Sequence, residues 1–146
     1  TRAPLVTRDL DLFKQFETIQ VNMTVTTDSE KIRKAFEPFC PSNKMRLDAI
    51  KELHEAGVDA CITLTPLLPV ENPEQFALDL KATGIPKFII QPFHSGGGKF
   101  VRGTRDEALS LLREFNWSTQ EYQRIFKIIQ SHIPHIGVGK EGFAPV

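Results

Sequence analysis

The chain has 146 residues, 18 basic and 18 acidic side chains, 40% hydrophobic residues and two cysteines. With a net charge of zero, the chain lacks the excess of positive charge that is typical of a general nucleic-acid-binding protein. The apolar runs are too short to cross a bilayer, so no membrane contact is expected. Two cysteines do not make a disulfide framework, which favours a reducing, cytoplasmic setting. The length fits one domain, and the start at Thr1 without an apolar leader suggests a processed, trimmed or excised piece.

The first part of the chain alternates short β-rich runs with helical runs. Ala3–Thr7 predicts a very short first strand, and residues 8–17 have helical spacing. Residues 19–26 alternate strictly between apolar and polar side chains, which predicts a second strand. A capping box of Thr27 with Glu30 opens the next expected helix, which runs to about Phe36. Ser42 is the expected N-cap of the following helix, which runs to Ala56 and has Gly57 at the left-handed cap position.

The second part repeats this order. Strands are expected over residues 58–65 and 87–93, with a helix to about Thr83 between them, opened by Asn72 and Pro73. Two further helices close the chain. Their capping boxes pair Thr104 with Glu107 and Ser118 with Glu121. The tail from Gly137 is expected to lie over the surface or against a partner segment.

Strands that alternate with helices of this length indicate parallel βα units. We therefore predict an α/β fold, a partial (βα) barrel fragment with four parallel strands followed by C-terminal helices. Residues 1–94 would form the later βα units of a partial TIM-like barrel. Residues 95–146 would form a glycine-rich loop, two helices and the tail.

Two consecutive strands each keep one face polar. Asn22, Thr24 and Thr26 form that face on the first, and Cys61, Thr63 and Thr65 form it on the next. Helices must cover the apolar face, so the polar face would point to the barrel interior, where water or a ligand satisfies it. An antiparallel sheet with one wet face shows the same alternation, but hairpins would not require the intervening helices.

Ligands of parallel sheets gather at the carboxyl ends of the strands. Those ends carry hydroxyl, amide, imidazole and guanidinium groups beside an apolar wall; they are Thr7 and Arg8, residues 24–27, residues 65–69 and residues 91–94. Such a set suits a polar ligand with a flat ring. It offers no obvious pair of nucleophile and base and no paired carboxylates.

Several ordered blocks are similar to one known family. They are APLVTRDLDL from Ala3, AFEPFCPSNKMRLDAIKEL from Ala35, Ala56–Gly57, ITLTPLLP from Ile62, and the closing Phe100–Arg105, Trp117, Tyr122 and Gly142–Pro145. With these blocks the chain resembles the radical S-adenosylmethionine enzymes of the spore photoproduct lyase-like group. The resemblance implies S-adenosylmethionine and a 4Fe–4S cluster as cofactors.

One family signature is missing from these 146 residues. The family holds its cluster on a CxxxCxxC loop, whereas Cys40 and Cys61 lie twenty-one positions apart. The resemblance therefore implies a C-terminal portion whose partner is the missing N-terminal half of the barrel. That portion would contribute cofactor and substrate contacts and would not be active alone, and a nucleic-acid substrate follows only by family analogy.

The resemblance also implies which residues contact the cofactor. Asn22, Thr24 and Thr26 would meet the ribose and methionyl part, and Arg46 would pair with the carboxylate. A solvated charge on the helix surface is the other interpretation of Arg46. Residues 65–68, with Thr65 and Leu67, would lie near the adenine, and Gln91 and Phe93 would face the adenine or the substrate.

Other chemistry-bearing residues have plainer interpretations. Cys40 is expected to be a free thiol in a loop, and Cys61 a small packing residue on a strand. His132 and His135 lack nearby acidic or cysteine partners, so a metal site from them is not expected. His94 and the Gly96–Gly98 loop lack the spacing of a phosphate-binding loop, which leaves a lid or a plain loop.

Two functions remain open from the sequence. The first is the C-terminal portion of a radical S-adenosylmethionine enzyme of the lyase-like kind. The second is a non-catalytic βα module, a binding or scaffold protein that recognises a metabolite or a partner protein.

Overall fold

A computed structural model describes residues 1–93 and 106–143 of the chain. The elements follow in this order: the 3-10 helix η1 (Pro4–Asp9), α1 (Leu10–Phe13), β1 (Gln20–Thr24), α2 (Glu30–Phe36), α3 (Asn43–Glu55), β2 (Asp59–Leu67), α4 (Pro73–Ala82), β3 (Lys87–Pro92), α5 (Asp106–Glu114), α6 (Thr119–His132), β4 (Gly137–Val138) and the 3-10 helix η3 (Gly139–Phe143). His94, Gly96–Gly98 and the expected cap Thr104 lie outside the described residues.

The four strands form one sheet in the order β1-β2-β3-β4, and every neighbouring pair is parallel. In the register, Thr24 of β1 lies beside Thr63 of β2, and Thr63 lies beside Ile89 of β3. The parallel α/β architecture predicted from the sequence is therefore confirmed, and all carboxyl ends of the strands lie at the same edge.

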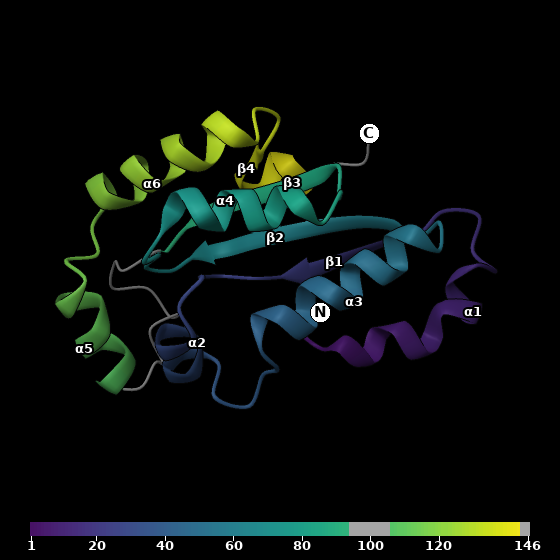
Figure 1. The fold of residues 1–146 in the computed structure, drawn as a ribbon, viewed down its shortest axis with the longest axis horizontal. Helices are drawn as coiled ribbons and strands as arrows, with labels where there is room; N and C mark the ends of the chain where they lie inside the picture. The colour runs from purple at the N-terminus through teal and green to yellow at the C-terminus, as the bar shows by residue number, and fades with distance from the viewer. Residues whose placement is uncertain (94–105, 144–146) are drawn as a thin grey trace.

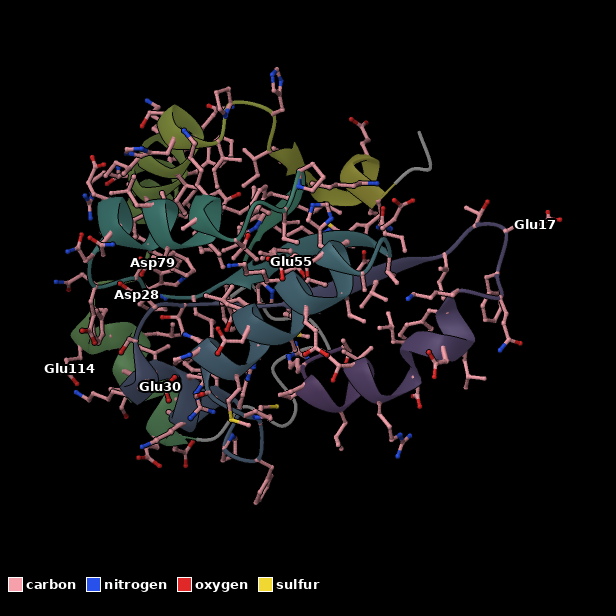
Figure 2. All side chains as sticks on the ribbon, turned by 45° about the vertical axis from the view of Figure 1, so that its right-hand side comes forward. Glu17, Asp28, Glu30, Glu55, Asp79 and Glu114 are labelled. Atoms are coloured by element: carbon pink, nitrogen blue, oxygen red, sulfur yellow. The ribbon has the colours of Figure 1, made fainter. Side chains whose placement is uncertain are left out.

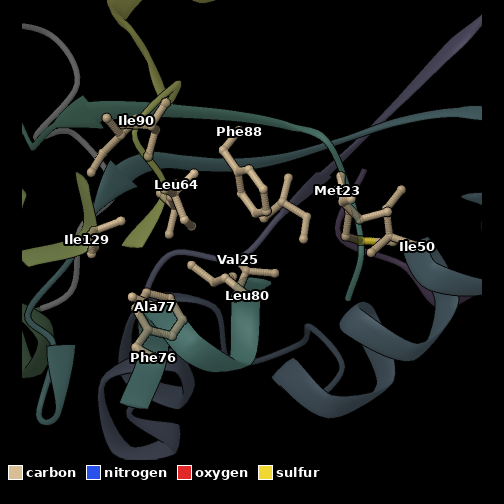
Figure 3. Packing of buried hydrophobic residues seen from close by; sticks show 14 of the residues in the cluster. Met23, Val25, Ile50, Leu64, Phe76, Ala77, Leu80, Phe88, Ile90 and Ile129 are labelled. Carbon is tan, nitrogen blue, oxygen red and sulfur yellow. The ribbon is translucent and has the colours of Figure 1, made fainter. Parts of the chain in front are cut away.

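Helices α3, α4 and α6 cover one face of this sheet. In Figure 1, α3 runs beside β1 while α4 runs beside β2 and β3. Their apolar stripes meet the inward side chains of the strands in one cluster, which includes Met23, Val25, Ile50, Leu64, Phe76, Leu80, Phe88, Ile90 and Ile129 (Figure 3). Alternation along the strands places these residues on one face and the polar residues on the other.

A second, smaller cluster lies where the strands end. Ile32 of α2, Leu68 and Leu111 of α5 are buried together, with Phe36, Phe93 and Phe115 packed against them. The rings of Phe36 and Phe93 meet edge to face at 6.0 Å. Figure 1 shows α2 and α5 at the end of the sheet toward which the arrowheads of β1 and β2 point. This end is therefore partly capped by apolar side chains.

The structure corrects the prediction of a first strand over Ala3–Thr7. Residues 4–9 form η1 instead, and Pro4 stands at its start. Proline has its φ fixed near the helical value and has no N–H to donate, so it suits the first turn of a helix better than a strand within a sheet.

The fourth strand comes from the other end of the chain. Gly137 and Val138, in the tail expected on the surface, pair with Ile89 and Ile90 of β3. A Cβ at Gly137 would lie 2.9 Å from Cα of Gly142, so the backbone of η3 approaches β4 too closely for any other residue. None of the described helices has the length and apolar composition needed to cross a membrane.

Candidate functional site

The sheet face opposite the helices carries the polar side chains of β1 and β2. Asn22, Thr24 and Thr65 are half-buried, and Thr63 is buried with 2% of its surface exposed. The Thr24 and Thr63 hydroxyl oxygens lie 3.0 Å apart and share a hydrogen bond across the two strands. Thr63 is thus shielded from solvent and the other three residues are partly shielded, and the four side chains form a polar wall near the carboxyl ends of the strands.

Hydrogen bonds also order the beginning of this wall. Lys87 Nζ donates to Gln20 Oε1 at 3.1 Å, and Gln20 Nε2 donates to Asn22 Oδ1 at 2.6 Å. Gln20 and Asn22 of β1 and Lys87 of β3 are thus held by hydrogen bonds to one another. The bond from Gln20 orients the Asn22 amide.

A carboxylate lies between two guanidiniums at the carboxyl end of β1. Glu37 Oε2 accepts a bond of 2.5 Å from Arg46 Nη2, and Glu37 Oε1 accepts one of 2.9 Å from Arg2 Nε. The Arg46 side chain is 0% exposed, that of Glu37 is 9% exposed, and that of Arg2 is 46% exposed. The cluster has two positive charges and one negative charge, and its excess positive charge is accessible only through Arg2.

Arg46 uses its other donors on the backbone. Its Nη1 donates to the Thr24 carbonyl at 2.9 Å, and its Nε donates to the Pro41 carbonyl at 3.1 Å. Of the two interpretations that the sequence left open, the solvated surface charge is wrong because the guanidinium is fully buried. Because the Arg46 side chain is 0% exposed, the predicted contact with a ligand carboxylate would require the residues around it to move.

The outer edge of β1 pairs with backbone that runs parallel to it. Thr1 N donates to the Asn22 carbonyl at 2.8 Å, and Thr24 N donates to the Thr1 carbonyl at 2.9 Å. These two bonds are the pattern of a parallel bridge between Thr1 and Met23. They place Arg2, the next residue, beside the end of β1.

The loops that follow β1 and β2 are joined by hydrogen bonds. Asp28 accepts from the backbone N–H of Glu71 at 2.8 Å and of Asn72 at 2.7 Å, and Thr27 donates to the Pro69 carbonyl at 2.5 Å. Asp28 and Asp79 of α4 line the same pocket (Figure 2), although the two residues belong to different βα units. The edge where ligands of parallel sheets gather is therefore held by two mutually fixed loops.

The remaining residues predicted to contact the cofactor lie in three different environments. Thr26 is buried, and its hydroxyl donates to Glu37 Oε1 at 3.5 Å. Leu67 is buried in the main cluster on the helix side, so its side chain packs there rather than in the polar wall. Gln91 is half-buried at the end of β3, on the same face as Thr63, while half-buried Phe93 packs against Phe36.

The cysteines and histidines of the described residues do not form a metal site. No group of three His, Cys, Asp or Glu side chains among them is placed to hold a metal ion. Burial raises the pKa of the Cys61 thiol to about 11, which disfavours the thiolate that binds iron. His132 Nε2 instead contacts Glu74 Oε2, which joins α6 to α4. The part of the chain described here therefore does not fit a 4Fe–4S cluster.

Sequence reasoning missed Arg2 and Glu37. Glu37 belongs to the FEP block, but its contact with Arg46 crosses the turn between two helices, and Arg2 joins from 35 positions away. The residue pattern alone carries no signal for these pairings.

The fold and this edge define a class: a parallel βα domain with a polar wall opposite its helix-covered core. The model of the Radical SAM superfamily matches residues 1–82. The chain belongs to this superfamily.

Two relatives match parts of the chain. An uncharacterized protein of Methanocaldococcus jannaschii is 42% identical over 69 residues, which are 47% of this chain and 27% of that protein. An uncharacterized protein of Acidianus two-tailed virus is 26% identical over 106 residues, 66% of this chain and 35% of that protein. The chain thus matches about a third or less of each relative's length, and no solved structure matches it.

Proposed function

We propose that the chain is the C-terminal portion of a radical S-adenosylmethionine enzyme and that it contributes cofactor contacts at the carboxyl ends of β1, β2 and β3. The observation that carries the proposal is the polar wall of Asn22, Thr24, Thr63 and Thr65, which faces away from the helix-covered core. Hydroxyl and amide groups of this kind suit the ribose and methionyl groups of the cofactor. Superfamily membership does not favour the alternative of a non-catalytic scaffold.

Within this proposal the accessible guanidinium takes the carboxylate of the cofactor. A guanidinium binds a carboxylate through two parallel hydrogen bonds. Arg2 is half-exposed and has donors beyond its Nε contact, whereas Arg46 is buried and bonded to Thr24, Pro41 and Glu37. We therefore assign the carboxylate contact to Arg2, and to Arg46 the task of holding the end of β1.

The finer assignment to the spore photoproduct lyase-like group rests on the sequence blocks given above. In that group the cluster is carried by a CxxxCxxC loop, and these 146 residues contain no such loop. The cluster would belong to another part of the barrel, and the bound cofactor would supply the radical chemistry. The edge of β1, which already pairs with parallel backbone at Thr1, is where we place the partner half of the barrel.

Binding of S-adenosylhomocysteine, measured by isothermal titration calorimetry, tests the proposal. Thr65→Val removes a half-buried hydroxyl of the wall and keeps the branched shape. We expect about fivefold weaker binding, which corresponds to roughly 1 kcal/mol for one hydrogen bond. Thr119→Val is the matched control, because Thr119 is exposed at the start of α6 on the helix side. Absence of binding by the unsubstituted chain, or equal effects of both variants, would contradict the proposal.

A further inference from the structure

Glu37 is a nearly buried carboxylate that the proposed cofactor contacts do not use. It follows directly after α2, and it accepts from one guanidinium that is wholly buried and from one that is half-exposed. Its contact with Arg2 is made through Nε, at 2.9 Å. Arginine carries five N–H donors in a planar fork, so a contact at Nε leaves donors of both terminal nitrogens for another acceptor.

We propose that Glu37 is a positioning residue that acts through Arg2. By holding the Nε side of the fork, Glu37 orients the remaining donors of Arg2 toward the carboxylate of an S-adenosyl ligand. The inference rests on the proposed function, because it requires that ligand to bind at the end of β1.

The surrounding contacts explain why Glu37 can do this. Hydrogen bonds to the Thr24 and Pro41 carbonyls fix the Arg46 guanidinium in place. Its Nη2 donates to Glu37 Oε2 at 2.5 Å and so holds the carboxylate. The Thr26 hydroxyl donates to the other oxygen, Oε1, at 3.5 Å. The carboxylate is thus immobilised on the protein side, and Arg2 is the member of the cluster that extends from it toward solvent.

Removal of Glu37 could in principle strengthen ligand binding instead of weakening it. If Glu37 only competed with the ligand for Arg2, its removal would leave more positive charge and strengthen binding of an anionic group. A positioning role predicts weaker binding instead. The sign of the change therefore separates the two roles.

Two ligands and a double-mutant cycle test the inference. S-Adenosylhomocysteine carries the carboxylate, and methylthioadenosine is the matched ligand without it. We expect Glu37→Gln to weaken binding of S-adenosylhomocysteine about tenfold, which corresponds to about 1.4 kcal/mol and lies near the lower end of the range for a hydrogen bond to a charged group. Methylthioadenosine should bind within twofold of the unsubstituted chain. In an Arg2→Ala background, Glu37→Gln should have no further effect on either ligand.

Control variants separate this role from a structural one. Glu30→Gln removes a carboxylate of α2 that pairs with a different arginine, Arg33, and should leave both affinities unchanged. Should Glu37→Gln not fold, Arg2→Lys serves in its place. It leaves the Glu37–Arg46 pair intact but removes the fork, and the same selective loss is expected.

The outcomes separate the role of Glu37 from the proposed function. Unchanged or tighter binding of S-adenosylhomocysteine in Glu37→Gln, or equal losses for both ligands, would overturn the inference and leave the proposed function standing. Retained affinity in Arg2→Lys would overturn the inference together with the assignment of the carboxylate contact to Arg2. No binding of S-adenosylhomocysteine by the unsubstituted chain would overturn both.

Discussion

Arg46 is the largest of the fully buried side chains in the described part of the chain. A guanidinium remains charged in the interior only when acceptors replace its water, and here two carbonyls and Glu37 do so. Removing one partner from such a buried pair leaves an uncompensated charge, so the pair fixes the local geometry more than it adds net stability. Arg46 therefore holds the chain segments that meet at the end of β1, and its contact with a ligand carboxylate stays a prediction.

The two cysteine thiols differ in their burial. Cys61 is buried on β2, where desolvation raises its pKa to about 11, whereas Cys40 is half-buried in the loop before α3. At pH 8 only roughly a thousandth of Cys61 would be thiolate, the form that reacts. We expect iodoacetamide to modify Cys40 well before Cys61 in the folded chain, as read by peptide mass spectrometry. Equal rates for the two would contradict the burial of Cys61, and denatured chain is the control.

At the scale of elements, the helix ends follow local rules. Ser42, Asn72 and Ser118 accept bonds from Met45, Gln75 and Glu121 backbone N–H groups, as predicted. The cap of α2 differs: Ser29 takes this role, accepting from Ile32, and Thr27 accepts from Ser29 while it donates to Pro69. The loop between β1 and α2 is pulled toward the next βα unit, and the cap moves two residues along.

Substitution of Asp28 tests whether its hydrogen bonds couple the loop after β1 to the loop after β2. Asp28→Ala removes both acceptors for the Glu71 and Asn72 N–H groups. We expect a loss of about 1–2 kcal/mol in the free energy of unfolding in urea, typical of a lost cap. Hydrogen exchange at the amides of Glu71 and Asn72 should also become faster. Asp48→Ala is the control, because its exposed pair with Lys44 should contribute less than about 1 kcal/mol. Equal losses for the two variants would refute the coupling.

At the scale of the whole molecule, the chain has two apolar clusters of unequal size. The larger lies between the sheet and α3, α4 and α6, and the smaller joins α2, α5 and the end of β3. Only the larger cluster involves three strands, so global stability depends on it. The smaller cluster holds the elements at the edge where we place the ligand.

Truncation in each cluster should therefore have different consequences. Leu64→Ala in the larger cluster should lower the free energy of unfolding by about 2–5 kcal/mol and speed hydrogen exchange throughout β1–β3. Leu111→Ala in the smaller cluster should speed exchange in α2 and α5 while amides of β2 and β3 keep their protection. Loss of protection in β2 and β3 after Leu111→Ala would show that the two clusters unfold together.

The sequence by itself determined the features that depend on neighbouring residues. Alternation with period two separated Met23 from Thr24 and Ile62 from Thr63. The caps Ser42, Asn72 and Ser118 marked the starts of three helices, and Gly57 marked the end of α3. The parallel sheet followed from the order of these elements. All of these signals are carried within a few positions of the chain.

Tertiary structure decided what joins distant or weakly patterned residues. The pairing of Gly137 with Ile89, the move of Thr26 and Leu67 into buried positions, and the cluster of Arg2, Glu37 and Arg46 depend on which backbone segments meet in space. A guanidinium in a sequence does not state whether its acceptor will be water, a carbonyl or a carboxylate. That choice is made by burial, because desolvation penalises every charge that the assembled chain leaves without a partner.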